Sequence, residues 1–333
     1  MPIASRDSKD CRESSMRKIG WVFIGIVILM ASCLVGPVPL WDSGLDRPTA
    51  YEILFSLRMP RTVVAFMVGG GLGLSGAVLQ GFLRNPLADT SLLGVGSGAA
   101  FFAVLGLSFG LAVYSPWAIP LLAIGGGIIT LLLIKIFLKG QESPLHLILL
   151  GIALNSFYGS LIAFVLNISK NPYALSHMIF WLFGSYADIP WAPLIGALPF
   201  MLLGTIFLLK TAPLLDALSF GEDMAKSLGF SLKKGINFLM VGIGLIVGLS
   251  VALCGLIGFI GLVVPHAVRF LVSSKPSKTL IPSFIGGGML SLLADIMVRL
   301  LPCQVELKVG VMTALIGSPF FIYLLYRSRH AQL

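Results

Sequence analysis

Residues 62–83 read TVVAFMVGGGLGLSGAVLQGFL, a stretch of 22 residues without a single charged side chain. A helix crosses the hydrocarbon core of a bilayer with about 20 apolar residues. Arg58 and Arg61 precede the stretch and Arg84 follows it, so that charge marks both of its ends. The stretch therefore predicts a transmembrane helix.

The composition extends this prediction to the whole chain. Of its 333 residues, 57% are hydrophobic and only 11% are charged, and the mean hydropathy is +0.97. A soluble protein carries roughly 25% charged residues, and a soluble fold of this length would lack the polar residues to cover its surface. These values exclude an ordinary soluble enzyme, a disordered chain and a disulfide-stapled secreted domain, and they indicate a membrane protein.

Apolar runs bounded by charge, proline or glycine predict an all-α, polytopic bundle of about ten transmembrane helices. The predicted spans are residues 20–40, 62–83, 91–111, 116–138, 144–168, 191–209, 235–253, 256–272, 280–300 and 308–326. The first run is about twice as long as a signal-peptide core and has no small-residue cleavage site, so we expect it to be retained. The turn between the seventh and eighth spans is the weakest boundary, and a nine-span alternative would merge them.

Basic residues orient this bundle. With the N-terminus inside, 17 of the 23 Lys and Arg residues fall on the cytoplasmic side, as expected for cytoplasmic loops. The bias supports ten spans with both termini cytoplasmic, whereas nine spans would place Arg327 and Arg329 outside. The predicted organisation is a cytoplasmic tail at 1–19, a ten-helix transmembrane domain at 20–327, and a cytoplasmic tail at 328–333.

Two connections are long enough to fold. The outer connection contains an apolar and aromatic stretch at 177–186, which predicts a short helix at the membrane surface. The inner connection at 210–234 contains GEDMAKSLG at 221–229, which predicts a short amphipathic helix ended by glycine. A faint similarity between residues 71–82 and 248–259, in spans of opposite direction, fits an inverted repeat of the kind that transporters use.

Several kinds of chemistry find no support in the sequence. The four cysteines and four histidines are scattered, without the spacing of a zinc site. The pattern GxGxxG at 71–76 falls inside a span, and no GxxxxGK[ST] loop occurs. Basic residues form short clusters between apolar runs, not one face for nucleic acid. We therefore expect no catalytic residue, metal, cofactor or nucleic-acid partner, and the motor of any pump must be another polypeptide.

Polar side chains near or inside the spans are the candidates for function. Arg58, Arg61 and Arg299 lie on the disfavoured outer side at span ends. They either snorkel toward the interface or face an acidic partner outside. Asp295 lies four residues before Arg299, which favours a local ion pair.

Two further groups are polar. Residues 85–89, NPLAD, form an inside turn, where proline and small polar residues interrupt a helix. Asn155, Ser156 and Ser160 lie in the fifth span, where they either line a pathway or hydrogen-bond across helices. The sequence leaves both alternatives open for these three residues.

Taken together, the motifs resemble the iron-siderophore, haem and cobalamin permease family of ATP-binding cassette (ABC) importers, called the FecCD type. The resemblance covers residues 20–327. Its motifs are RMPR at 58–61, LSGAVLQG at 74–81, RNPLAD at 84–89, LGV at 93–95, GFIGLVVPH at 258–266, and residues 310–321. Singly most of them are weak, whereas the set is specific.

The resemblance implies a permease of the bacterial cytoplasmic membrane that imports an iron chelate, either a ferric siderophore or haem. It implies a homodimer, or a heterodimer of paralogous permeases, with the pathway between the subunits. An ABC ATPase dimer would bind inside, and a periplasmic or lipid-anchored substrate-binding protein would bind outside. The alternative cargo is cobalamin or molybdate.

The resemblance also implies roles for individual residues. The arginines that match a docking site for acidic residues of the binding protein are Arg58, Arg61 and Arg299. The residues that match a cytoplasmic gate are Asn85 and Leu87, with 141–145 as a neighbouring loop. The residues that match a coupling helix for the ATPase are Glu222, Ala225 and Gly229.

Two positions depart from the family pattern, and two other classes of protein stay as rivals. Thr90 and Lys308 stand where the family usually has proline, and Lys308 adds a positive charge at the outer face. An ion-driven secondary carrier would need an acid at midspan, and Asp295 near a span end is the one acid within an apolar run. An intramembrane enzyme would need a catalytic constellation, which the spans lack.

Overall fold

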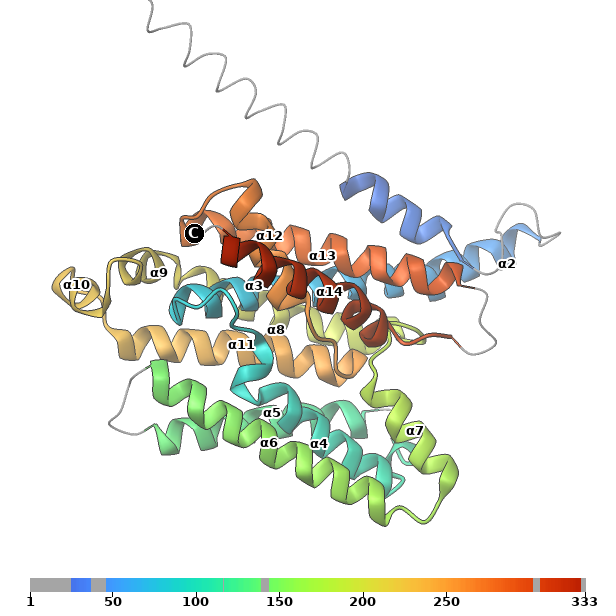
Figure 1. The fold of residues 1–333 in the computed structure, drawn as a ribbon. Coiled ribbons are helices and arrows are strands. Elements are labelled where there is room, and N and C mark those ends of the chain that lie inside the picture. The colour runs from blue at the N-terminus through green and yellow to red at the C-terminus, as the bar shows by residue number, and fades with distance from the viewer. Residues whose placement is uncertain (1–24, 37–45, 116, 139–143, 302–305, 331–333) are drawn as a thin grey trace, which may run out of the picture.

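The computed structural model describes residues 25–36, 46–115, 117–138, 144–301 and 306–330. In these ranges the chain folds into helices joined by turns, without a β-strand (Figure 1). The all-α fold class predicted from the sequence is therefore confirmed. The predicted tail 1–19 and residues 141–143 of the predicted gate loop lie outside the described residues.

The described elements begin with a helix at Gly25–Leu34 and continue in chain order. They are α2 Arg47–Glu52, the π-helix η1 Ile53–Arg58, α3 Met59–Phe82, the 3₁₀ turn η2 Thr90–Leu93, α4 Val95–Ser108, the 3₁₀ turn η3 Leu111–Val113, α5 Ala118–Phe137, α6 Pro144–Ile168, α7 Pro172–Leu182, α8 Trp191–Leu209, α9 Ala212–Leu218, α10 Glu222–Ser227, α11 Leu232–Cys254, α12 Ile260–Leu271, α13 Pro276–Leu300 and α14 Val309–His330.

Each of the ten predicted spans contains one helix of this set. Among the described residues, six helical stretches are long and apolar enough to cross a membrane: those containing α3, α5, α6, α8, α11 and α13. The other four spans contain the helix at Gly25–Leu34, α4, α12 and α14, whose apolar parts are shorter. The number of membrane crossings and the cytoplasmic position of both termini stay predictions.

Several boundaries differ from the sequence-based prediction for local reasons. The helix of the second span reaches back to Arg47, because α2, η1 and α3 are continuous. The third helix begins at Val95 instead of residue 91, because η2 and the left-handed Gly94 (φ 69°) precede it. Helix α11 ends at Cys254 before Gly255 (φ 73°), and α12 begins only at Ile260. The two helices are separate, whereas the choice between ten and nine membrane crossings stays a prediction.

Both connections form helices, with shifted bounds, while the place of the outer helix at the membrane surface stays a prediction. The outer one forms α7, which begins at Pro172 instead of residue 177, because the side chain of Asn171 caps its first turn and accepts from the Tyr173 amide at 3.0 Å. The inner one forms α9 and α10. Helix α10 ends two residues before Gly229 (φ 83°), the glycine that the sequence predicts as its stop.

Helix α3 is the centre of the bundle. The most apolar part of the stretch that contains it is 83% buried, against 17% for α6. Its most extensive contact is with α13, and two glycines allow that contact. A Cβ atom at Gly69 would lie 2.2 Å from the Cβ of Ser291, and one at Gly73 would lie 2.4 Å from the carbonyl oxygen of Ser283. Small residues permit this kind of close helix approach in lipid.

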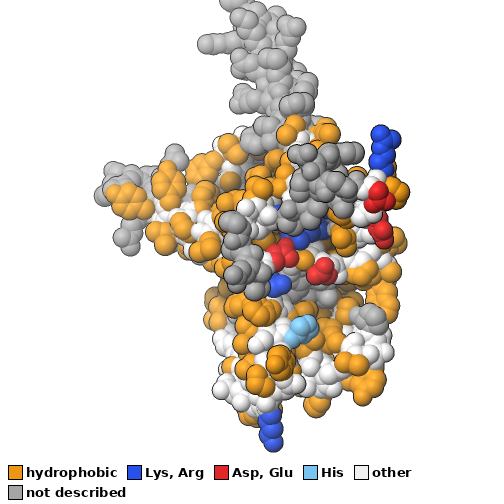
Figure 2. Space-filling view, turned by 90° about the vertical axis from the view of Figure 1, so that its right-hand side faces the viewer, with side chains coloured by type: hydrophobic (Ala, Val, Ile, Leu, Met, Phe, Trp, Pro, Cys, Tyr) orange, Lys and Arg blue, Asp and Glu red, His pale blue; other side chains and the backbone are white. Residues whose placement is uncertain are grey.

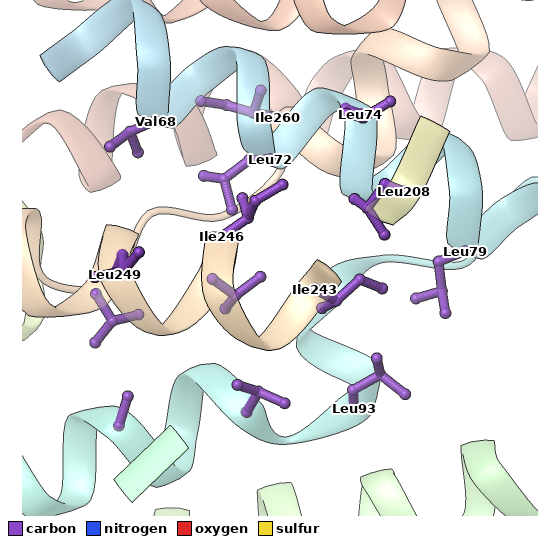
Figure 3. Close-up of a cluster of buried hydrophobic side chains, with 14 of the residues drawn as sticks. Val68, Leu72, Leu74, Leu79, Leu93, Leu208, Ile243, Ile246, Leu249 and Ile260 are labelled. Carbon is purple, nitrogen blue, oxygen red and sulfur yellow. The ribbon is translucent and has the colours of Figure 1, made fainter. Parts of the chain in front are cut away.

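The other faces of α3 pack against α11, α12 and α8. Figure 3 shows Leu72 of α3 beside Ile246 of α11, in a cluster of aliphatic side chains that also draws on α8 and α4. Helix α6, in contrast, forms one side of the molecule and leaves most of its surface open. The uncharged stretch at residues 62–83 thus lies in the most buried of the six long apolar helical stretches.

Candidate functional site

Charged side chains gather at the end of the bundle that the sequence predicts to face outward. Arg61 lies in the first turn of α3, Asp295 and Arg299 lie in the last two turns of α13, and Glu306 precedes α14. Arg58 is the last residue of η1. Figure 2, which looks onto this end, shows basic and acidic side chains among hydrophobic ones. We call these five residues the outer charge cluster.

Asp295 is the centre of this cluster. Its side chain has no exposed surface and pairs with two arginines. Its Oδ1 accepts from Nε of Arg61 at 2.9 Å and from Nη2 of Arg61 at 2.7 Å, and its Oδ2 accepts from Nε of Arg299 at 2.9 Å. The predicted pair of Asp295 and Arg299 is confirmed. Such charge-assisted contacts, made in a fork geometry, are strong and directional.

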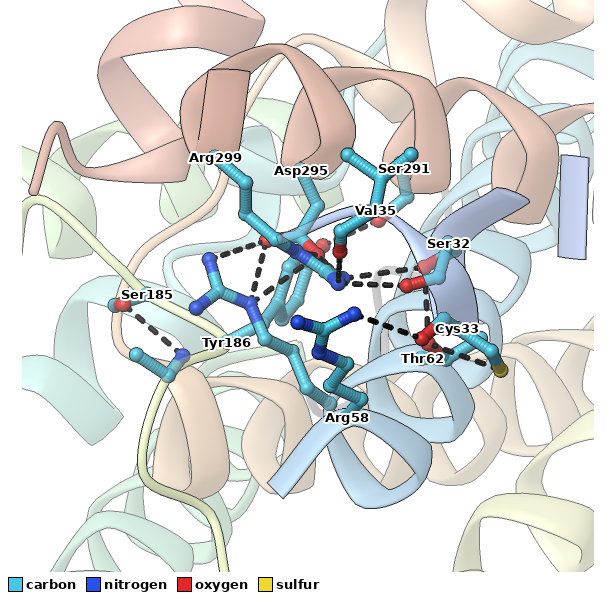
Figure 4. Close-up of polar contacts among 12 residues, drawn as sticks. Ser32, Cys33, Val35, Arg58, Thr62, Ser185, Tyr186, Ser291, Asp295 and Arg299 are labelled. Atoms are coloured by element: carbon cyan, nitrogen blue, oxygen red, sulfur yellow. Dashed lines mark hydrogen bonds and ion pairs between the residues drawn. The ribbon is translucent and has the colours of Figure 1, made fainter. Parts of the chain in front are cut away.

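Two arginines of the cluster also hold the end of the N-terminal helix (Figure 4). Arg299 donates from Nη1 to the carbonyl oxygens of Ser32 and Val35, at 2.6 and 3.1 Å. Arg58 donates from Nη1 to the carbonyl oxygens of Cys33 and Leu34. The last carbonyls of a helix have no partner within the helix, and cations there also complement its dipole. The arginines therefore stabilise a helix end that their positive charge suits.

The members of the cluster differ in how far water can reach them. The Arg299 side chain is 3% exposed, that of Arg61 is 14% exposed and that of Glu306 is 37% exposed. Arg61 and Glu306 meet at 2.5 Å, so the accessible edge of the cluster is this pair. Three arginines against two acids leave the cluster with one net positive charge.

A buried hydrogen bond lies next to the outer charge cluster, on the side toward the interior of the bundle. The hydroxyl groups of Tyr186 and Ser291 lie 2.6 Å apart, and both residues are fully buried. Ser291 lies one helical turn before Asp295 on α13. The local sequence does not predict this contact, because Tyr186 belongs to the connection after α7 and is 105 residues away from Ser291.

The predicted docking arginines are therefore brought together, but mostly beneath the surface. Arg58 and Arg299 are buried, and Arg61 reaches the surface only in part. Their contact with a binding protein stays a prediction. The sequence missed Asp295 as the partner of Arg61, because the two are 234 residues apart.

The predicted gate residues form a compact turn at the opposite end. The side-chain oxygen of Asn85 accepts from the Leu87 amide at 2.9 Å, and its carbonyl accepts from the Ala88 amide at 3.2 Å. Turns of this kind are what Asn before Pro favours. Leu87 is 44% exposed. Its apolar side chain thus projects from a fixed turn, while a gating role stays predicted.

The predicted coupling residues surround α10 at the same end. The side chain of Glu222 is 33% exposed and lies 3.9 Å from that of Arg84. Ala225 is fully buried, so the face of α10 that carries it is packed against its neighbours, among them α9. Gly229 has φ 83°, and a Cβ atom there would meet nothing within 4 Å. A side chain at this position would strain the backbone without a steric clash.

Asn155, Ser156 and Ser160 all lie on the open surface of α6. The Ser160 hydroxyl donates to the Ser156 carbonyl at 3.0 Å, a bond within its own helix. The exposed Phe157 and Phe164 share this side of the molecule. A mixed polar and aromatic surface that the rest of the subunit does not cover is consistent with a pathway lining, which stays a prediction.

Metal chemistry finds no site in the described part of the chain. No three His, Cys, Asp or Glu side chains lie together there in a way that can hold an ion. The described cysteines, Cys33 and Cys254, form no disulfide. This geometry can hold paired charges at one end of a helical bundle and present a short helix with exposed side chains at the other.

Known proteins match this chain along nearly its whole length. The pattern of the FecCD transport family matches residues 19–327. The ABC transporter permease protein YvrB of Bacillus subtilis is 36% identical, over 93% of this chain and 92% of that protein. The vitamin B12 import system permease protein BtuC of Yersinia enterocolitica is 35% identical over 92% of each chain. A solved structure described as an inward-facing, metal-chelate type ABC transporter has a TM-score of 0.84 and 33% identity, over 93% of this chain and 98% of that one.

Proposed function

The chain belongs to the FecCD transport family, and we propose that it imports a metal chelate across the bacterial cytoplasmic membrane. It is an ABC importer permease of the BtuC type with several membrane-spanning helices. The observation that supports the proposal within the chain is the outer charge cluster, a set of arginines assembled at one end of a bundle that is otherwise apolar. The permease catalyses no covalent step in this proposal.

The cargo is proposed from the chemistry that the relatives name. The sequence-based hypothesis is a ferric siderophore or haem. BtuC relatives, 34–35% identical, are named for vitamin B12 import, and the solved neighbour is described as metal-chelate type. All of these are large chelates of a metal ion. We therefore place cobalamin first among the cargoes to be tested and a ferric chelate second.

Delivery to the outer end would use charge. A substrate-binding protein that carries acidic residues would meet the one net positive charge of the outer charge cluster, with Arg61 as the accessible arginine. Complementary charges at a rim of this kind mainly accelerate and orient docking. Arg58 and Arg299 would act by holding the surrounding helix ends in place.

Transport would be driven from the inner end. An ABC ATPase dimer would bind α10, whose two acids, Glu222 and Asp223, lie in its first turn. Movement of α10 on ATP binding would then shift an equilibrium between inward- and outward-facing states. Gly229 would let the chain turn sharply after α10, and the turn at Asn85 and Leu87 would restrict the inner mouth.

A dimer would place α6 at the pathway. The open surface of α6 carries Asn155, Ser156 and Ser160 next to aromatic side chains, which suits a wide chelate with polar and apolar parts. A homodimer or a heterodimer of paralogous permeases would satisfy this geometry. The rival of an ion-driven carrier is disfavoured, because Asp295 is saturated by two arginines near the end of α13.

Uptake in cells tests the cargo. A strain that lacks this permease is supplied with radiolabelled cyanocobalamin, with a labelled ferric siderophore, or with labelled haem. Uptake is then measured again after the gene has been restored on a plasmid. Restoration of cobalamin uptake alone would support the first proposal, and restoration of iron uptake alone would support the second. If the gene restores uptake of no chelate, the proposed cargo class is wrong.

A further inference from the structure

A basic cavity at the inner end is used by none of the roles described above. It has a volume of about 360 Å³ and lies where the end of α3, the link between α9 and α10, α12 and the start of α13 meet. Two of its nine lining residues are arginines, Arg84 and Arg269, and none is acidic. Its volume is many times the roughly 30 Å³ that one water occupies in the liquid, so a polyatomic anion fits.

Arg269 is held rigidly at the wall of the cavity by a neutral partner. Its Nη2 donates to the side-chain oxygen of Gln80 at 2.6 Å. The amide nitrogen of Gln80 faces the carbonyl oxygens of Ala88 and Gly261, at 3.1 and 3.2 Å. Because that nitrogen donates and those oxygens accept, the orientation of the amide is fixed. Within the described ranges no acid forms an ion pair with Arg269.

Arg84 completes the positive rim. Its backbone has φ 50°, a left-handed conformation that residues other than glycine adopt rarely. Half of its side chain is exposed, and the ion pair that it forms with Glu222 is long at 3.9 Å. An exposed pair of this length contributes little. The guanidinium is thus free to turn toward a second anion, and strained backbone positions of this kind often mark functional sites.

One acid at this end of the bundle, Asp216, is already matched. Asp216 accepts from the Ser277 amide at 2.9 Å, in the first turn of α13, and pairs with Lys275 at 3.2 Å. The negative charge of Asp216 is therefore directed to the start of α13 and its lysine, not to the arginines of the cavity.

We propose that this cavity binds a phosphate-bearing anion between Arg84 and Arg269. Guanidinium groups are suited to phosphate oxygens, which they bind in a fork geometry. The cavity lies at the end of the central apolar helix, on the side predicted to be cytoplasmic, where basic pockets between helices meet anionic lipid headgroups. The headgroup of an anionic phospholipid and free phosphate share this chemistry.

Occupancy of the cavity would have a consequence for α10. Arg84 cannot face a bound phosphate and Glu222 at full strength at once, so the anion would loosen the contact between the end of α3 and α10. This consequence rests on the proposed coupling role of α10. The binding itself depends on neither the cargo nor the ATPase.

Binding can be measured on the purified full-length permease by native mass spectrometry. Phosphatidylglycerol is the anionic probe, phosphatidylcholine is the zwitterionic comparison, and inorganic phosphate is the competitor. The variant Arg84→Ala removes one charge from the rim, whereas Lys278→Ala removes one from an exposed site at the same end that does not line the cavity. Arg84 is used because Arg269 also holds Gln80, and loss of Arg269 would disturb the fold.

We expect phosphatidylglycerol to bind more tightly than phosphatidylcholine, with a loss of about fivefold in Arg84→Ala and an unchanged affinity in Lys278→Ala. If millimolar phosphate binds instead, with the same dependence on Arg84, the site stands and its source is the free anion. The proposal would be overturned if the wild type bound the two lipids equally and if Arg84→Ala changed the affinity for neither lipid nor phosphate. None of these results bears on the cargo, so failure here is distinct from failure of the proposed function.

Discussion

The two ends of the bundle hold charge in opposite ways. In the outer charge cluster, a fully buried Asp295 accepts from two arginines at 2.7–2.9 Å. At the inner end, Arg84 and Glu222 lie 3.9 Å apart, and their side chains are 50% and 33% exposed. A buried acid that lost its arginines would be costly, whereas an exposed pair can exchange partners at little cost. The outer end is thus built as a rigid face and the inner end as one that can move.

The largest expected effect breaks the rigid end. Asp295→Asn would leave Arg61 and Arg299 without their shared buried acid, and we expect the free energy of unfolding to fall by about 3–5 kcal/mol. Reversible unfolding in mixed detergent micelles measures this change.

Glu222→Gln is the matched variant at the inner end, and we expect it to change the free energy of unfolding by no more than about 0.5 kcal/mol. Equal effects of Asp295→Asn and Glu222→Gln would remove the distinction between the two ends.

The next effect concerns docking. Reversal of Arg61 to Glu would place an acid against Asp295, so Arg61→Gln is the cleaner change, because Arg299 still neutralises Asp295. We expect the affinity for the cognate binding protein to fall about tenfold at low salt and less at high salt. Surface-plasmon resonance on the detergent-solubilised permease measures it. Arg47→Gln, on the exposed start of α2, is the control, and an equal loss there would deny Arg61 a special role.

A smaller effect is expected at the hinge after α10. Gly229→Val places a β-branched residue at φ 83°, which costs about 1–2 kcal/mol in local strain. We expect uptake to fall while ATP hydrolysis by the assembled transporter continues. Leu228→Val, at an exposed neighbouring position, should leave both activities unchanged. Full uptake by Gly229→Val at equal expression would argue against a coupling turn at this position.

The smallest expected effect concerns the two acids of the outer charge cluster. Glu306 occupies Arg61 at 2.5 Å, so an acidic partner must share this arginine with it. Glu306→Gln raises the net charge of the cluster from one to two, and we expect about threefold tighter docking. Glu52→Gln removes the same charge from an exposed residue of α2. If Glu306→Gln and Glu52→Gln tightened docking equally, the effect would come from the net charge of the surface and not from the release of Arg61.

The parts of this structure that follow from local sequence could be predicted. The bounds of α6 and α8 match the predicted spans, because charge or proline ends each apolar run. The pair of Asp295 and Arg299 follows from a four-residue spacing on one helix. The FecCD family also follows from motifs in the chain.

Contacts across the fold could not be predicted in this way. Arg61 meets Asp295 over 234 residues, and Tyr186 meets Ser291 over 105, distances at which periodicity carries no information. Arg58 and Arg299 donate to carbonyl oxygens at the end of the N-terminal helix, and such backbone acceptors have no signature in the sequence. Apolar glycine-rich helices can pack in many pairings, so the central place of α3 also required the fold.

We propose that the rigid outer end of the permease receives the cargo and that ATP binding by the ATPase moves the inner end. Uptake by proteoliposomes that contain the permease, its ATPase and its binding protein tests this most directly, with labelled cyanocobalamin and then a labelled ferric chelate as cargo. We expect uptake of one cargo only when ATP, the ATPase and the binding protein are all present. Uptake that persists without ATP or without the ATPase would contradict the proposal.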